Sequence, residues 1–212
     1  MNCDKNKLLL YAVTDRSWLG EESLYRQVQK AIKGGATFIQ LREKELDRDA
    51  FLEEAVEIGK LCRMYGVPLI INDDVEIAKQ AGADGVHVGQ DDMEVKQVRA
   101  MLGPDKIIGV SAHTVEEALL AEAAGADYLG AGAVFGSSTK EDVTVLSHER
   151  LQEICGAVKI PVVAIGGINR QNIMELKGTG ISGVAVVSAI FAQEDIEGAA
   201  ADLRQCAEEI VQ

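Results

Sequence analysis

The sequence repeats one pattern from end to end: a short apolar run is followed by a stretch with helical spacing, and then by the next apolar run. Eight runs rich in valine and isoleucine can be counted, each too short for a helix and each ending in glycine or polar residues. They span residues 8–15, 37–43, 68–73, 85–90, 107–112, 128–134, 161–167 and 183–189. Near-continuous hydrophobicity is what strands buried on both faces require. We therefore predict eight strands of a parallel sheet.

Amphipathic stretches lie between these runs, at residues 22–33, 51–63, 115–124, 151–157 and 196–211. In the second of them Phe51, Ala55, Ile58 and Cys62 fall on one helical face. Strict alternation of strand and helix with short connections indicates parallel βαβ units. We predict an α/β fold, a single compact (β/α)₈ TIM barrel domain over residues 1–212, with a doubly wound open sheet as the alternative. A typical barrel of this kind has about 250 residues, so the loops have to be short.

Composition excludes several classes of partner. The net charge of −13 counts against nucleic acid and against anionic membranes as partners. The four cysteines are scattered and form no C-x-x-C pair, which favours reduced thiols. The polar start and the shortness of the apolar runs argue against a signal peptide and against a membrane span, so we expect a cytoplasmic protein. A homo-oligomer is left open.

Polar residues gather where the predicted strands end. In a barrel these ends converge on one face, which is where active sites of this fold lie. The turns that lead from helix to strand, at the opposite face, offer mostly glycine, alanine and valine. This asymmetry predicts an enzyme. The polar segments are Gln40-Leu41-Arg42-Glu43-Lys44, Asn72-Asp73-Asp74, Gly89-Gln90-Asp91-Asp92, Ser111-Ala112-His113, Gly136-Ser137-Ser138-Thr139-Lys140, Gly166-Gly167 and Val187-Ser188.

Two pairs of aspartates follow neighbouring predicted strands. In each pair, Asp73 with Asp74 and Asp91 with Asp92, we expect one member to cap the next helix. Two such pairs exceed what capping requires, and carboxylates from adjacent strand ends can share a Mg²⁺ ion, which favours one or two carboxylates plus phosphate oxygens. His87 lies inside an apolar run and is interpreted as a packed histidine rather than a ligand.

Two segments are candidate anion sites. The loop Ser137-Ser138-Thr139-Lys140 offers hydroxyl and backbone donors with one cation. The second candidate combines Gly166-Gly167 with Val187-Ser188, since phosphate sites in this fold commonly use the last two strand ends and glycine lets backbone amides approach the phosphate. Two anion sites with a metal between them suggest two phosphorylated reactants, or one carrying phosphate and the other pyrophosphate.

These segments, taken in order, resemble the thiamine-phosphate synthase family over nearly the whole chain. The matching stretches are Tyr11-Ala12-Val13-Thr14-Asp15, Gln40-Leu41-Arg42-Glu43-Lys44, Ile71-Asn72-Asp73, Gly85-Val86-His87-Val88-Gly89-Gln90-Asp91-Asp92, Gly109-Val110-Ser111-Ala112-His113, Thr139-Lys140, Ile165-Gly166-Gly167-Ile168 and Val187-Ser188-Ala189. Each stretch is short, but eight in the same order form a specific signal.

The resemblance implies a transferase that joins a hydroxymethylpyrimidine pyrophosphate to a thiazole phosphate with the help of Mg²⁺, through a pyrimidine carbocation formed when pyrophosphate leaves. It implies that the pyrimidine pyrophosphate is bound by Gln40, Leu41, Arg42, Glu43, Lys44, Asn72, Ser111 and Lys140. Of these, Arg42, Lys44, Ser111 and Lys140 would act in catalysis. Mg²⁺ would be held by Asp73 and Asp92. The thiazole phosphate would lie against Ser137, Ser138, Thr139, Gly167, Val187 and Ser188.

Three other functions remain as alternatives. A thiazole tautomerase on the same barrel needs neither metal nor pyrophosphate. The synthase is favoured by the joint presence of Asp73, Asp92, Arg42, Lys44 and Lys140. A Schiff-base aldolase would use Lys44 or Lys140, but it requires a desolvated lysine with a lowered pKa. A regulator that binds a phosphorylated metabolite without turnover cannot be separated from an enzyme by fold alone.

Overall fold

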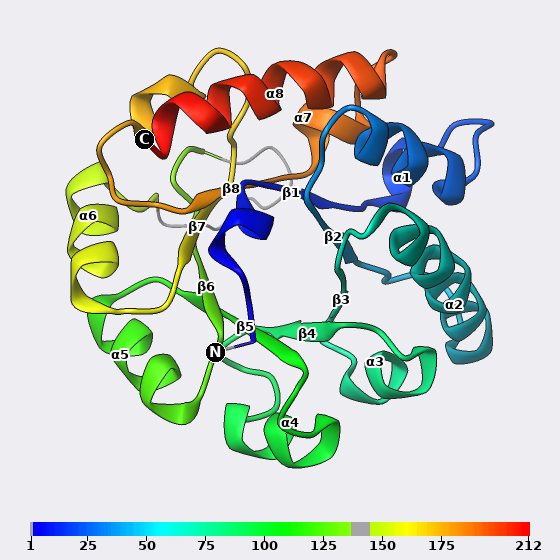
Figure 1. Cartoon of the computed structure of the whole chain (residues 1–212), viewed down its shortest axis with the longest axis horizontal. Helices are drawn as coiled ribbons and strands as arrows, with labels where there is room; N and C mark the ends of the chain where they lie inside the picture. Colours follow the sequence, from blue (N-terminus) through cyan, green and yellow to red (C-terminus); the bar gives the residue numbers. More distant parts are fainter. Residues whose placement is uncertain (1, 137–144) are drawn as a thin grey trace.

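The computed structural model describes residues 2–136 and 145–212, and its strands form one closed parallel barrel in chain order (Figure 1). The closed ring confirms the predicted barrel and excludes the open sheet. The strands are shorter than the apolar runs, because the polar residues at the ends of each run lie in loops. They are β1 Leu10–Val13, β2 Phe38–Leu41, β3 Leu69–Asn72, β4 Gly85–Val88, β5 Ile107–Ala112, β6 Tyr128–Gly132, β7 Val162–Ile165 and β8 Gly183–Val186.

Helices surround the barrel (Figure 1). They are α1 Leu24–Lys33, α2 Arg48–Tyr65, α3 Val75–Ala81, α4 Val95–Leu102, α5 Val115–Ala124, α6 His148–Ala157, α7 Ser188–Phe191 and α8 Ile196–Ile210, with short 3₁₀ helices η1 Lys5–Leu8, η2 Arg16–Trp18 and η3 Ile173–Leu176. Capping explains where two of them begin. The side chain of Ser23 accepts a hydrogen bond at the start of α1, and Asp47 does so for α2, which starts earlier than its apolar face predicts.

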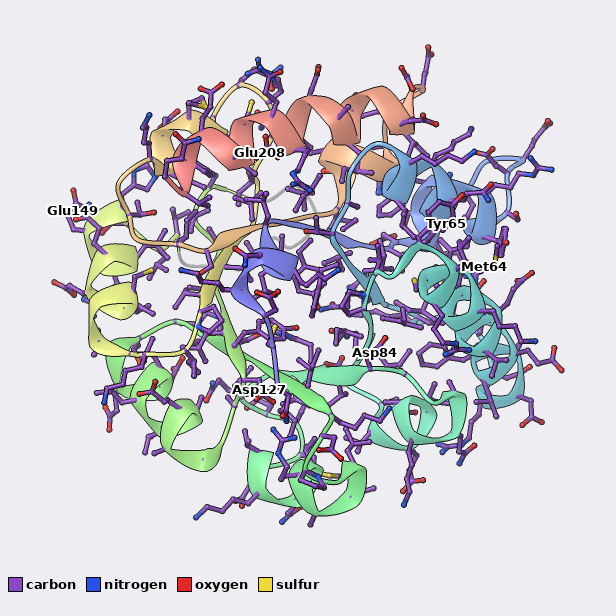
Figure 2. The ribbon with its side chains drawn as sticks, in the orientation of Figure 1. Met64, Tyr65, Asp84, Asp127, Glu149 and Glu208 are labelled. Atoms are coloured by element: carbon purple, nitrogen blue, oxygen red, sulfur yellow. The ribbon has the colours of Figure 1, made fainter. Side chains whose placement is uncertain are left out.

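Strand alternation divides the buried side chains into an outer and an inner core. The outer core lies between strands and helices and includes Leu10 and Ala12 of β1. The inner core fills the barrel and includes Tyr11 and Val13 of the same strand. The ribbon with side chains shows this interior occupied (Figure 2). The barrel is therefore a packed core with its site at one end, as this fold requires.

Buried and partly buried carboxylates stabilise the turns at the amino-terminal ends of the strands through hydrogen bonds. Asp127 accepts hydrogen bonds from Ile108 N at 3.0 Å and from Arg99 Nη2 at 2.6 Å, while Asp84 accepts from Leu69 N at 2.8 Å. Both aspartates lie inside the ring of helices (Figure 2). The backbone N–H of Asn2 also donates to Asp127, at 2.6 Å, so the start of the chain is tied across this end of the barrel. Asp84 and Asp127 thus have structural partners at this end of the barrel.

No helix within the described residues is long and apolar enough to cross a membrane.

Candidate active site

The ends of β1 and β2 are tied together by side chains at the mouth of the barrel. The buried Thr14 accepts a hydrogen bond from Arg42 N at 3.0 Å through its hydroxyl, and its own N–H donates to Gln40 O at 2.9 Å. The Arg42 guanidinium donates to Asp15 Oδ2 at 3.0 Å. Burial alone would raise the pKa of Asp15, but hydrogen bonds from Ser17 and Arg42 outweigh it and hold that pKa below its usual range. Arg42 is therefore held in place as a cation at the mouth.

The next carboxylate, Glu43, is used to build the loop. Its side chain is 2% exposed and accepts hydrogen bonds from Lys44 N and Glu45 N, each at 2.7 Å. Its second oxygen accepts from Arg16 Nε at 2.7 Å. Burial by itself raises its pKa, and these bonds reverse the effect and lower it. Glu43, predicted to bind substrate, thus shapes the loop that presents the exposed Lys44.

Leu41 was also predicted to contact substrate, but its side chain belongs to the outer core and is fully buried against the helices. Only its main chain is available at the barrel mouth. The reason is the strand period of two, which places Gln40 toward the barrel interior and its neighbour away from it.

The predicted metal ligands Asp73 and Asp92 face each other across the ends of β3 and β4. Asp73 has a left-handed backbone with φ of 63°, and Asn72 Nδ2 donates to its Oδ2 at 2.6 Å. Asp92 Oδ2 accepts from Gly89 N at 2.7 Å. Partial withdrawal from water, and then the carboxyl of Asp92 within hydrogen-bonding reach, raise the pKa of Asp73 to about 6, although Lys44 works against this.

A pair of facing carboxylates is under repulsion unless a proton or a cation lies between them. Within the described residues, no group of three or more histidine, cysteine, aspartate or glutamate side chains is arranged to hold a metal ion. The pair is therefore incomplete as an all-protein metal cage. It matches the simpler requirement of Mg²⁺, which takes one or two carboxylates together with phosphate oxygens and water.

The capping predictions for the two aspartate pairs have different outcomes. Asp74 caps α3, accepting from Ile77 N at 2.8 Å, as predicted for one member of its pair. The prediction that Asp91 or Asp92 caps the following helix is wrong. The residue at the start of α4 is Glu94, and it makes no side-chain capping bond. Asp92 lies two residues before it, and its carboxylate accepts from Gly89 N instead.

Ser111 at the end of β5 is hydrogen-bonded to a buried histidine. His87 Nε2 lies 3.0 Å from Ser111 Oγ, and His87 Nδ1 lies 3.0 Å from the hydroxyl of Tyr128. Burial lowers the pKa of His87 to about 4, although the nearby Asp92 raises it in part, so the imidazole is neutral near pH 7. The interpretation of His87 as a packed histidine is confirmed. Gln90 also reaches this strand end, donating to Ser111 O at 2.5 Å.

The hydroxyls of Tyr128 and Tyr11 continue this network to Gln40. The sequence analysis gave neither tyrosine a role, although Tyr11 begins one of the matching stretches. A signal was nonetheless available, since both tyrosines lie inside apolar runs. A buried tyrosine hydroxyl needs a hydrogen-bond partner, and this requirement points to polar neighbours in the barrel interior.

The ends of β6 and β7 pack closely against each other at glycines. Gly166 and Gly167 have φ of 100° and 67°. Phe135 N donates to Gly166 O at 3.0 Å, and a Cβ placed on Gly167 would lie 2.6 Å from Gly136 O. Glycine is thus required here by both conformation and space.

The remaining predicted phosphate-binding residues differ in what can be said of them. Val187 and Ser188 stand at the end of β8, where α7 begins, and both are half-buried. Their place beside the end of β7 follows from the pairing of β7 with β8. Ser137, Ser138, Thr139 and Lys140 lie outside the described residues.

Comparison with known proteins gives a consistent result. The family model for thiamine monophosphate synthase matches residues 10–190. A thiamine-phosphate synthase of Clostridium acetobutylicum is 51% identical over 188 residues, 89% of each chain, and one of Ruminiclostridium cellulolyticum is 50% identical over 194 residues, 92% of each chain. The structure of a thiamine phosphate pyrophosphorylase from Pyrococcus furiosus matches with a TM-score of 0.90 and 41% identity, covering 98% of this chain and 99% of that one. The resemblance predicted from the motifs is confirmed: the chain belongs to the thiamine-phosphate synthase family of transferases.

Proposed function

We propose that the protein joins a hydroxymethylpyrimidine pyrophosphate to a thiazole phosphate, forming thiamine phosphate and releasing pyrophosphate. The observation that carries this proposal is that Arg42, fixed by Asp15, lies at the same end of the barrel as the facing carboxylates Asp73 and Asp92. Such a site suits a metal–pyrophosphate group better than a neutral substrate.

The pyrophosphate would be bound by donors from neighbouring strand ends. Asp15 engages one nitrogen of Arg42, and a guanidinium has five N–H donors in all. Lys44 is exposed at the same loop and supplies a second positive charge. Asn72 and Ser111 would add neutral donors from β3 and β5. Together these groups can stabilise negative charge as it builds on the leaving group.

Asp73 and Asp92 would hold Mg²⁺. The fit rests on the donor set, because two facing carboxylates with a raised pKa at one of them form a site that a divalent cation relieves. When bound, the ion would neutralise charge on the pyrophosphate and make it a better leaving group.

The proposed chemistry needs positioning more than proton transfer. The pyrimidine C–O bond breaks, its electron pair leaves with pyrophosphate, and the thiazole nitrogen supplies the pair for the new C–N bond. His87 is buried with both ring nitrogens hydrogen-bonded, and the proposal gives it no role as a base. The exposure of Lys44 does not suit a Schiff-base aldolase, which requires a desolvated amine.

The thiazole phosphate would bind at the ends of β7 and β8. Gly167, Val187 and Ser188 would offer main-chain donors there, since glycine lets a backbone amide approach a phosphate closely. By the family resemblance, Ser137, Ser138 and Thr139 would also bind the thiazole phosphate, and Lys140 would bind the pyrophosphate. Holding both reactants in contact contributes much of the rate in such reactions.

The test is release of pyrophosphate from the pyrimidine pyrophosphate by the purified protein, with and without the thiazole phosphate and with and without Mg²⁺. We expect release only when all three are present. Asp92→Ala should abolish it, whereas Asp91→Ala, in the same loop, should retain it. A folded protein that releases no pyrophosphate in any combination would refute the proposal and favour the tautomerase or a binding protein.

A further inference from the structure

A chain of hydrogen bonds crosses the interior of the barrel and joins two residues that the proposed function places against the same substrate. Gln40 Nε2 donates to the hydroxyl of Tyr11 at 2.6 Å, and this hydroxyl lies 2.8 Å from that of Tyr128. The Tyr128 hydroxyl lies 3.0 Å from His87 Nδ1, and His87 Nε2 lies 3.0 Å from Ser111 Oγ. The three connecting side chains are buried.

The direction of the chain follows from its first bond. Because Tyr11 accepts from Gln40, its single proton is donated to Tyr128, the next hydroxyl in line. Tyr128, having accepted from Tyr11, has its own proton left to donate to His87 Nδ1, 3.0 Å away. A neutral imidazole that accepts at Nδ1 carries its proton at Nε2, and this N–H donates to Ser111 Oγ. The hydroxyl proton of Ser111 is then turned away from His87.

We propose that Tyr11, Tyr128 and His87 are positioning residues that fix the hydroxyl of Ser111 as a hydrogen-bond donor toward the pyrophosphate. The inference rests on the proposed function, which puts pyrophosphate next to Ser111. If the chain ran the other way, Ser111 would donate to His87 and present only lone pairs to an anion, which is repulsive.

Packing alone does not explain these residues. Other large side chains of the inner core, such as Phe38, Ile70 and Val163, are apolar. Phenylalanine would fill nearly the same volume as Tyr11 or Tyr128 and would avoid the cost of burying a hydroxyl. A buried polar network is favourable only when each member is paired, and here the pairing is continuous from one substrate-binding residue to the other.

The decisive experiment measures Tyr128→Phe, which keeps the ring and removes the central hydroxyl. Phe38→Leu is the matched control, because its ring packs edge-on against Tyr128, at 5.7 Å between centroids, and carries no polar atom. We expect Tyr128→Phe to lower kcat/KM for the pyrimidine pyrophosphate by about tenfold or more, the worth of a hydrogen bond to a charged group. The KM for the thiazole phosphate should be unchanged, and Phe38→Leu should have a much smaller effect.

A double-mutant cycle separates positioning from general damage. In a Ser111→Ala background, the hydroxyl that the hydrogen-bond chain orients is absent. Adding Tyr128→Phe to this background should therefore lower kcat/KM by less than about twofold. Equal losses with and without Ser111 would refute the proposal, as would a loss in Phe38→Leu as large as that in Tyr128→Phe.

The tautomer of His87 gives a readout that needs no substrate. Nitrogen NMR of the ¹⁵N-histidine-labelled protein should show His87 protonated at Nε2 in the unaltered chain, and this preference should weaken in Tyr128→Phe. Protonation at Nδ1 in the unaltered chain would overturn the stated direction. An inactive but folded protein would refute the proposed function, and the tautomer would still decide the direction of the hydrogen-bond chain.

Discussion

The facing carboxylates at the barrel mouth predict that removing one charge makes the metal-free protein more stable. Asp73→Asn deletes a charge while keeping the size and shape of the side chain. Asparagine tolerates the φ of 63° at this position, since it enters the left-handed region more readily than most residues. The substitution therefore removes the charge of Asp73, with both its desolvation cost and its repulsion from Asp92, without adding backbone strain.

The size of the effect follows from the pKa of Asp73, which is raised from 3.8 to about 6. The folded protein binds this proton more tightly than the unfolded chain, so the free energy of unfolding falls as pH rises between about 4 and 6. At about 1.4 kcal/mol per pKa unit the ceiling is about 3 kcal/mol. Asp73 is exposed, and screening by solvent reduces the expected gain to about 1 kcal/mol near pH 7.5. Near pH 4 the gain should vanish.

The assay is urea unfolding followed by circular dichroism, in buffer stripped of divalent ions, at the two pH values. Asp91→Asn is the matched control, because this exposed carboxylate lies in the same loop as Asp92. Adding Mg²⁺ should stabilise the unaltered protein, as a ligand of the folded state does, and should stabilise Asp73→Asn much less. A variant that is no more stable than the unaltered protein near pH 7.5, or equally stabilised at both pH values, would refute the reasoning.

Two further substitutions test the loops around the site. Gly167→Ala places a Cβ at φ of 67° and 2.6 Å from Gly136 O, whereas Gly178→Ala has φ of 83° but no described atom within 4 Å of its Cβ. Left-handed strain costs about 1–2 kcal/mol, so urea unfolding should show a larger loss for Gly167→Ala, and equal losses would contradict the clash. Glu43→Gln should lower the free energy of unfolding by about 1–2 kcal/mol near neutral pH, since it weakens the bonds to Arg16 and the loop. Because the pKa of Glu43 is lowered, its stabilisation is lost as pH falls through that pKa, and a loss that persists unchanged at about pH 3 would count against an ionic origin.

The barrel could be predicted because its signal is repeated. Each strand buried on both faces has to be apolar, and each helix has to present one apolar face, so errors at single boundaries leave the alternation intact. Boundaries were less well determined. The helix predicted at residues 51–63 begins at Arg48, because the capping side chain of Asp47 sets its start and apolar spacing does not report the cap.

The position of a single site residue could be predicted only where the strand alternation gives its face and the end of the strand gives its depth in the barrel. Gln40 and Ser111 are placed this way, and so is the outward side chain of Leu41, which follows from the same alternation. The hydrogen bond between Tyr11 and Tyr128 could not be predicted from the hydrophobic pattern, since β1 and β6 are not neighbours in the ring and these side chains meet across its interior. Periodicity tells which face a residue occupies, and barrel closure determines which residue lies opposite.

The proposed function requires a chain of net charge −13 to bind anionic substrates, and the local charge at the barrel mouth explains how it can. Charges farther away than about 8 Å are largely screened at physiological salt, so the local set decides. That set is mixed, because Asp15 partly offsets Arg42, and Asp73 and Asp92 would repel a bare pyrophosphate. A divalent cation between the carboxylates changes the sign of this contribution. Metal and pyrophosphate should therefore each raise the affinity for the other by the same factor, as linkage between two binding events requires, and the carboxylates that oppose the substrate alone would help to select its metal complex.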